Sequence, residues 1–275
     1  MMKPLFLVSN DDGIQSIGLE ILVEHLGQLG DVIVAAPDGE RSAIGHGISL
    51  SHPLRTVQWA PNQHAISGTP ADCVLLGLME FCPRRPDLVI SGINLGLNLG
   101  TDVFYSGTLA AALEGAIRGI TAVAVSQEVP SLRSFEYQQT MKNIIPERLG
   151  RTAHFACQVI QEIIETPLPP SSVLSINAPL APGESFVWTC LGRRVYREDM
   201  EKRNDLRGVP YYWIGGPVQL TDDQEESDSY AIEHGKISVT PLHLDLTAKI
   251  PTSAHHWKLQ SEAPVSKKKK SHVSS

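Results

Sequence analysis

The chain has 275 residues, enough for one large domain or two small ones, and its 42% hydrophobic and 19% charged residues are typical of a globular protein. Its 23 basic and 30 acidic residues give a net charge of -7, and four lysines form one run at residues 267–270, so the rest of the chain carries 19 basic and 30 acidic residues, or -11. This balance excludes a protein that coats nucleic acid, because such a protein needs a basic surface.

The first half of the chain alternates between strand and helix patterns. Short apolar runs predict buried strands at residues 5–9, 31–36, 87–91 and 121–126, with a further short strand at residues 65–67. Apolar residues at helical spacing predict helices at residues 17–29, 71–81 and 109–117, the second of them starting after Thr69-Pro70. The polar, glycine-containing segments 38–51 and 92–106 are predicted loops. This alternation predicts an α/β fold, with a mostly parallel sheet covered by helices on both faces.

The second half is less regular. A helix is predicted at residues 152–165, and strands at residues 173–177 and 237–242. Between residues 186 and 240, aromatic residues stand among short polar stretches, which favours hairpins or an arm. A polar tail follows, and its lysine run indicates a solvated, disordered segment. We therefore expect one domain over residues 1–252, with residues 186–240 as an oligomerisation arm, and a largely disordered tail over residues 253–275.

The cysteines and the apolar segments bear on the cellular compartment. The four cysteines, at positions 73, 82, 157 and 190, lie far apart without a CxxC pair, which indicates reduced thiols rather than a zinc ribbon or a disulfide framework. The short apolar start of the chain leads directly into acidic residues, unlike a signal peptide. No segment approaches the ~20 apolar residues of a membrane span. We expect a cytoplasmic protein that does not bind a membrane.

Two adjacent acids follow the first predicted strand. Asp11 and Asp12 stand before Gly13, where the carboxyl end of a strand in an open α/β sheet meets its ligands. Carboxylate oxygens suit a hard divalent cation such as Mg²⁺ or Mn²⁺. The alternative is that these residues form only a polar turn.

A second strand end carries a loop rich in glycine and asparagine. The strand at residues 87–91 leads into Asn94 and Asn98, and the loop closes at Ser106-Gly107-Thr108, where a helix is predicted to begin. Backbone N–H groups and hydroxyls at a helix N-terminus favour an anion. The alternative for either hydroxyl residue is an ordinary helix N-cap.

The loop after the second strand adds Arg41-Ser42. Ser42 is a candidate metal ligand through its hydroxyl, and Arg41 a candidate partner for an aspartate or a phosphate, but local sequence alone favours a capped turn. The chain has no GxGxxG after the first strand, no GxxxxGK[ST] and no GxSxG. A dinucleotide-binding fold is therefore disfavoured, and a P-loop NTPase and the common serine hydrolase are excluded.

Five ordered motifs together resemble the SurE family, whose members are called survival proteins. They are Ser9-Asn10-Asp11-Asp12-Gly13, Ala36-Pro37-Asp38 with Arg41-Ser42, Gly68-Thr69-Pro70-Ala71-Asp72-Cys73, Ser91-Gly92-Ile93-Asn94 and Tyr105-Ser106-Gly107-Thr108. Later matches are Ser175-Ile176-Asn177-Ala178-Pro179, Pro210-Tyr211-Tyr212-Trp213 and Ser238-Val239-Thr240-Pro241-Leu242. The resemblance covers about residues 4–250, nearly the whole chain outside the tail.

The resemblance implies a Rossmann-like α/β fold with a C-terminal hairpin extension used in oligomer contacts, and we expect a homodimer or homotetramer. It implies an enzyme, a metal-dependent 5′/3′-nucleotidase that hydrolyses nucleoside monophosphates to nucleoside and phosphate, and some members also trim short polyphosphate. We expect one divalent ion, Mg²⁺ or Mn²⁺. The family's metal ligands fall on Asp11, Asp12, Ser42 and Asn94. The phosphate-facing residues fall on Asn98, Ser106, Gly107 and Thr108.

Asp11 is the predicted catalytic residue. It would orient or deprotonate the attacking water, or serve only as a ligand, and a covalent aspartyl-phosphate ranks lower because a carboxylate committed to a metal is a poor nucleophile. His46, His52 and His64 are candidates for the acid that protonates the leaving alcohol, although a packed or solvated histidine is favoured for each. Cys73 is interpreted as a packed thiol.

Two other classes of protein remain open. One is a non-catalytic nucleotide or phosphate sensor with the same pocket, and the other is an assembly protein that uses the aromatic arm. The full set of oxygen ligands favours the enzyme. The acidic charge balance disfavours a nucleic acid polymer, so the expected partner is a small nucleotide.

Overall fold

The computed structural model describes residues 3–130, 145–169, 171–183, 185–196, 199–215, 218–220 and 224–247. Met1–Leu244 form one compact unit, and Asp245–Ser275 form a second. The predicted domain end at residue 252 and the predicted tail at residues 253–275 lie outside the described residues. Within the described ranges, no helix is long and apolar enough to cross a membrane.

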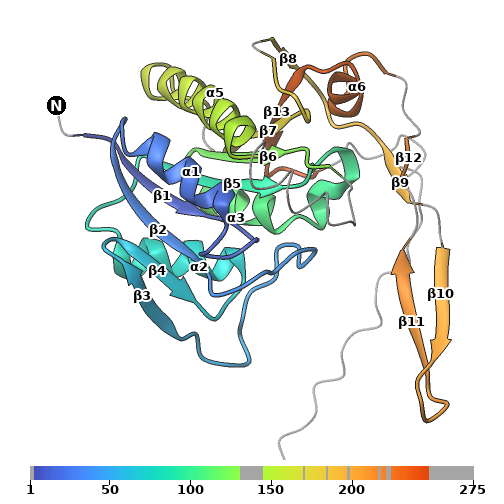
Figure 1. Cartoon of the computed structure of the whole chain (residues 1–275). Helices are drawn as coiled ribbons and strands as arrows, with labels where there is room; N and C mark the ends of the chain where they lie inside the picture. Colours follow the sequence, from blue (N-terminus) through green and yellow to red (C-terminus); the bar gives the residue numbers. More distant parts are fainter. Residues whose placement is uncertain are drawn as a thin grey trace, which may run out of the picture. The chain divides into compact units, whose positions relative to one another are not determined.

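A single large sheet organises the chain (Figure 1). In the described residues it has nine strands in the order β3-β4-β2-β1-β5-β6-β7-β13-β8. The strands are β1 (Leu5–Ser9), β2 (Asp31–Pro37), β3 (Thr56–Ala60), β4 (Gln63–Ile66), β5 (Leu88–Leu95), β6 (Ala122–Gln127), β7 (Ser172–Ala178), β8 (Phe186–Trp188) and β13 (Ile237–His243). All pairs from β4 to β7 are parallel, whereas β3–β4 and β13–β7 are antiparallel. The predicted mostly parallel sheet is confirmed.

Helices cover both faces of this sheet. Helix α1 (Ile17–Leu26) packs against α5 (Ile145–Glu165), and α2 (Pro70–Leu76) packs against α3 (Gly107–Ile117). Successive residues of β1 point to opposite faces, so Phe6 joins the apolar core with α1 and α5, whereas Leu7 joins the core with α2 and α3. Burial of the central strands on both sides explains their uninterrupted apolar sequence.

Several element boundaries differ from the sequence prediction. Thr69 and Asp72 form a capping box at the start of α2, but the predicted helix 71–81 ends at Leu76 and continues as one wider turn, η1 (Gly77–Phe81). Helix α5 begins at residue 145 rather than at the predicted residue 152. The sequence shows no clear helical pattern for its first turns, because they carry polar residues with few apolar ones between them. Strand β3 was not predicted, since it is an exposed edge strand without an apolar run.

The region between residues 186 and 240 contains the expected hairpins and one further helix. Strands β10 (Asp199–Asn204) and β11 (Pro210–Gly215) form an antiparallel hairpin, and β9 (Arg194–Tyr196) pairs with β12 (Val218–Leu220) (Figure 1). Helix α6 (Asp228–Glu233), capped by Ser227, follows. The hairpin exposes Met200, Leu206, Val209, Tyr211, Tyr212 and Trp213.

The strand order places a topological switch point at β1 and β5. From β1 the chain continues to β2 and β4 on one side, and then returns to β5, β6 and β7 on the other. In open α/β sheets, ligands bind outside the carboxyl ends of the strands at such a point. Asp11 and Asp12 follow β1, and Asn94 lies at the C-terminal end of β5, so the fold brings these residues to the same edge of the sheet.

Candidate active site

The turn after β1 fixes the direction of the two acids. The side-chain amide of Asn10 donates to the carbonyl of Gly13 (2.9 Å), and the N–H of Gly13 donates back to Asn10 Oδ1 (3.2 Å). Gly13 has φ +99°, and a Cβ there would lie 3.0 Å from the carbonyl carbon of Gly39. The turn therefore requires glycine, both for its backbone conformation and for the close approach of the loop after β2.

Asp11 lies against the N-terminus of α3. It is 4% exposed, and Thr108 Oγ1 donates to Asp11 Oδ1 at 2.5 Å. Burial raises the pKa of Asp11, while hydrogen bonding from the Thr108 hydroxyl and from the backbone N–H groups of Thr108 and Gly107 acts in the opposite direction. The helix N-terminus thus faces a carboxylate of the chain itself, which it holds in one orientation.

Asp12 is half-buried beside it. Its Oδ2 accepts a hydrogen bond from the N–H of Leu95 at the end of β5 (3.2 Å). Burial, with the neighbouring charge of Asp11, raises the pKa of Asp12 to about 6. Two neighbouring carboxylates with little access to water repel each other, and a bound cation would relieve this repulsion.

The other two predicted ligands, Asn94 and Ser42, carry neutral oxygens. The side-chain amide of Asn94 donates to the carbonyl of Gly96 (2.8 Å), which directs its nitrogen to the backbone and leaves Oδ1 for another partner. Ser42 is exposed, and its hydroxyl donates to Glu40 Oε1 (2.9 Å). Within the described residues no group of three or more His, Cys, Asp or Glu side chains is arranged for a metal. The four predicted ligands nonetheless carry only oxygen donors, a chemistry that fits Mg²⁺ or Mn²⁺.

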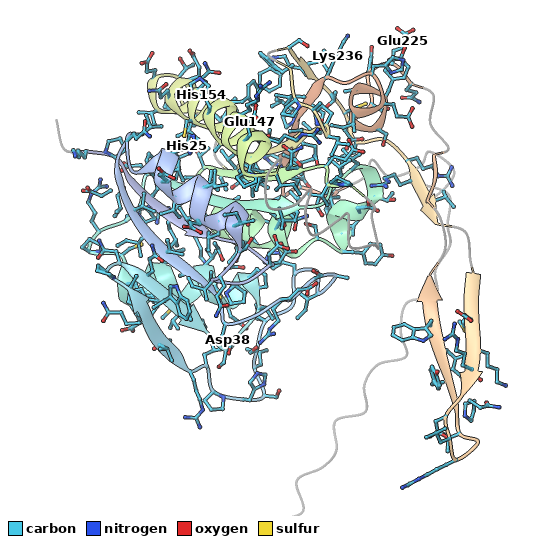
Figure 2. The ribbon with its side chains drawn as sticks, viewed as in Figure 1. His25, Asp38, Glu147, His154, Glu225 and Lys236 are labelled. Atoms are coloured by element: carbon cyan, nitrogen blue, oxygen red, sulfur yellow. The ribbon has the colours of Figure 1, made fainter. Side chains whose placement is uncertain are left out.

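The loop after β2 is held against the site by contacts from both of its neighbours. The N–H of Arg41 donates to the carbonyl of Asp11 (2.7 Å), and the N–H of Gly45 donates to the carbonyl of Tyr105 (2.9 Å). Arg41 forms an ion pair with Asp38 (2.8 Å). Asp38 is labelled in Figure 2. The predicted pairing of Arg41 with an aspartate is therefore the one found, and its backbone contact joins the loop that carries Ser42 to the turn that carries the two acids.

The predicted phosphate-facing side chains already have partners. Ser106 Oγ accepts from the N–H of Leu109 (3.0 Å), so Ser106 is the N-cap of α3. Asn98 donates its side-chain amide to Ser126 Oγ (2.8 Å), and its backbone exchanges two hydrogen bonds with the amide of Asn177. These residues shape the loop from within. Ser126 and Asn177 were not recognised as supports, although the motif at residues 175–179 contains Asn177.

The histidines and Cys73 have distinct surroundings. His64 stacks on Phe81 with ring centroids 3.7 Å apart, and burial lowers its pKa, so the structure assigns His64 to packing. His46 Nε2 lies 3.0 Å from Oε2 of the buried Glu114, two turns along α3 from its N-terminus, which ties the loop after β2 to that helix. His52 Nδ1 lies 3.4 Å from the hydroxyl of the neighbouring Ser51 in the exposed loop after β2. Burial holds the pKa of Cys73 well above its usual range, in agreement with a packed, unreactive thiol.

The raised pKa of Asp12 leads to a prediction for the metal-free protein. The folded state binds this proton more tightly than the unfolded chain, so ionisation of Asp12 destabilises the fold as pH rises from 3.8 through about 6. We expect Asp12→Asn to increase the free energy of unfolding by about 1–2 kcal/mol at pH 7.5, after allowance for partial solvent screening. The gain should shrink as the pH falls towards 4.

Urea denaturation in EDTA at several pH values measures this effect. Asp31→Asn, at an exposed position at the start of β2, is the matched control and should change little. A gain for Asp12→Asn that is equal at pH 7.5 and at pH 4.5 would contradict the electrostatic explanation.

Comparison with known proteins agrees with this architecture. Residues 6–198 match the family model described as survival protein SurE. A protein named 5′-nucleotidase SurE from Geobacter metallireducens is 43% identical over 244 residues, covering 88% of this chain and 92% of that protein. One of the same name from Pelotomaculum thermopropionicum is 44% identical over 250 residues, covering 88% and 90%. The crystal structure of the SurE protein from Aquifex aeolicus superposes with a TM-score of 0.74 at 37% identity, covering 89% of this chain and 95% of that one. The match extends over most of the chain and includes both its sequence and its fold, and the chain therefore belongs to the SurE family.

Proposed function

We propose that this chain is a 5′-nucleotidase, a metal-dependent phosphoric monoester hydrolase that converts nucleoside monophosphates to nucleoside and phosphate. The names of its relatives support the nucleotidase activity. The observation that carries the proposal is the position of Asp11, held by Thr108 at the N-terminus of α3 and next to a second carboxylate at the switch point of the sheet. A cation held there would stand directly beside a helix end that favours anions.

Asp11, Asp12, Ser42 and Asn94 would hold one Mg²⁺ or Mn²⁺. When bound, the ion supplies charge neutralisation for a phosphate dianion and lowers the pKa of a water molecule. Asp11 is the catalytic residue in this proposal, because Thr108 fixes the carboxylate where it can orient a water or accept its proton. Residues Asn98, Ser106, Gly107 and Thr108 would form the wall that faces the phosphate.

The substrate range is proposed to include nucleoside 5′- and 3′-monophosphates and short polyphosphate. The net negative charge of the chain supports small substrates over nucleic acid polymers, since a long polyanion would be repelled outside the site. A screen of nucleoside 5′- and 3′-monophosphates and triphosphate, with Mg²⁺, Mn²⁺ or EDTA, tests the proposal by measuring phosphate release. Turnover of AMP only in the presence of a divalent ion is the expected result. Binding of AMP without turnover would instead favour a phosphate or nucleotide sensor.

We also propose that the protein is cytoplasmic and forms a homodimer or homotetramer through the hairpin β10–β11. The support is the row of exposed large apolar residues on that hairpin, which is unusual for a surface in contact only with water. Deletion of residues 200–213 should reduce the number of subunits per particle, measured by sizing chromatography with light scattering. An unchanged number of subunits would show that the hairpin is not part of the interface.

A further inference from the structure

The loop between β5 and α3 is held by the C-terminal third of the chain. This loop, residues 96–106, contains the short helix η2 (Gly100–Phe104) and leads directly into the helix end that contacts Asp11. Thr101 Oγ1 donates to the carbonyl of Arg194 (2.6 Å), and the N–H of Gly100 donates to Asp228 Oδ2 (2.7 Å). Both partners belong to the region that surrounds the hairpin in sequence.

Asp228 divides its two oxygens between two segments. Oδ2 accepts from Gly100 in the loop, whereas Oδ1 accepts from the N–H of Gly192 (2.9 Å) and from Ser229 (N–H 2.8 Å, Oγ 3.4 Å). The side chain is fully buried. The carboxylate thus connects the 96–106 loop with the base of β9, and the energy of its burial is offset by these donors.

Arg194 adds a second connection. Its guanidinium forms an ion pair with Asp102 in η2 (2.5 Å), and the two side chains are only 15% and 11% exposed. The ion pair at Asp102 also restrains the start of α3, because the carbonyl of Asp102 accepts a hydrogen bond from the N–H of Ser106 (3.0 Å), the N-cap of that helix. A continuous series of contacts therefore runs from Asp228 and Arg194 to the helix end beside Asp11.

We infer that Asp228 and Arg194 are positioning residues, which hold residues 98–106 so that the phosphate-facing end of α3 keeps its place. This inference rests on the proposed function. Within the part of the chain that the structure describes, neither side chain contacts Asp11 or Asp12, so their effect is transmitted through the loop. Displacement of such a loop weakens binding of the phosphate in the ground state and in the transition state alike, which raises KM more than it lowers kcat.

Asp228→Asn is the decisive variant. An amide has one acceptor oxygen, and the three donors at Oδ1 outnumber the single one at Oδ2, so we expect the new NH₂ group to face the N–H of Gly100. The loop then loses its anchor while the base of β9 keeps its own. We expect KM for AMP, and the inhibition constant of inorganic phosphate, to rise about tenfold, with kcat changed less than about threefold.

Arg194→Met should have the same effect through η2, and Arg194→Lys should recover most of the lost affinity, since an ammonium can still pair with Asp102. Ser229→Ala removes the weak 3.4 Å contact to Asp228 and keeps the Ser229 N–H donor, so it is the matched control, with KM expected to stay at the wild-type value. Hydrogen exchange of the Gly100 amide in the metal-free protein gives a readout independent of turnover. It should accelerate in Asp228→Asn and in Arg194→Met.

The outcomes are separable. If the wild-type protein releases no phosphate from any nucleotide, the proposed function is wrong, and hydrogen exchange still tests the connection. If the wild type is active but Asp228→Asn and Arg194→Met show wild-type KM, phosphate inhibition and exchange, the inference is wrong. If the variants have a lower melting temperature but an unchanged KM, the inference is also wrong, and both residues contribute only to stability. Should Asp228→Asn fail to fold, the Arg194→Met and Arg194→Lys pair decides.

Discussion

Asp11→Asn is expected to lower metal-dependent phosphate release from AMP by about 10²–10⁴-fold, the range associated with loss of a group that moves a proton in the transition state. The substitution keeps the shape of the side chain and leaves Oδ1 as an acceptor for the Thr108 hydroxyl. It removes the negative charge that would attract a cation and the basic oxygen that would accept a proton. Steady-state kinetics with Mn²⁺ and with Mg²⁺ measure the loss.

The fold should survive this change. An amide keeps one acceptor oxygen but gives up the other, which faces the N–H groups of Thr108 and Gly107. Burial favours the neutral form of Asp11 and offsets this loss, so we expect the melting temperature to change little. Asp31→Asn, at the opposite end of the parallel strands, controls for the general effect of removing one acidic charge. Wild-type turnover in a folded Asp11→Asn protein would overturn the assignment of the site.

Gly107→Ala is expected to reduce activity by about 100-fold through steric displacement alone. A Cβ at this position would lie 2.7 Å from Asp11 Cβ and 2.9 Å from Asp11 Oδ2, which is too close for either residue to keep its place. The carboxylate would have to move away from the N-terminus of α3, and misplacement of a reacting group by about 1 Å can cost this much. Comparison of kcat/KM between variant and wild type measures the effect.

Gly150→Ala is the matched control for that experiment. Gly150 lies in α5, and among the described residues a Cβ there would meet no atom within 4 Å beyond the backbone of its own helix. Alanine is the better helix former, so we expect unchanged activity and an increase in stability of up to about 1 kcal/mol. If Gly107→Ala has wild-type activity, or if Gly150→Ala loses as much activity as Gly107→Ala, close packing against Asp11 is not what the reaction requires.

Much of the fold could be predicted because its signals are local. Strands β1, β2, β5 and β6 are short buried runs, and α2 begins with a proline and a capping box, which are features of a few neighbouring residues. The missed elements lack such signals. Strand β3 is stabilised by its partner β4 rather than by burial, and α6 is too short to show an apolar period.

The sequence could place several candidate site residues along the fold, but it could not predict their contacts. The acids after β1 and the asparagine in β5 could be placed at one edge, because parallel strands share the direction of their carboxyl ends. The sequence left open whether Ser106 is a helix N-cap or faces an anion, and the structure shows the cap. It did not reveal that Asn98 holds the loop through Ser126 or that His64 stacks on Phe81. Each of these roles depends on which side chain or backbone group the tertiary fold brings next to the residue.

The sequence by itself determined two things. The alternation of strand and helix patterns determined the α/β class, and the family motifs identified the pair of acids after the first strand. Only the tertiary structure decided what those acids touch. Thr108 is 97 residues from Asp11, Leu95 is 83 residues from Asp12, and Gly100 is 128 residues from Asp228. Local periodicity carries no information about such pairs, because they are selected by the strand order and by the burial of polar groups, which must find a partner wherever the chain brings one.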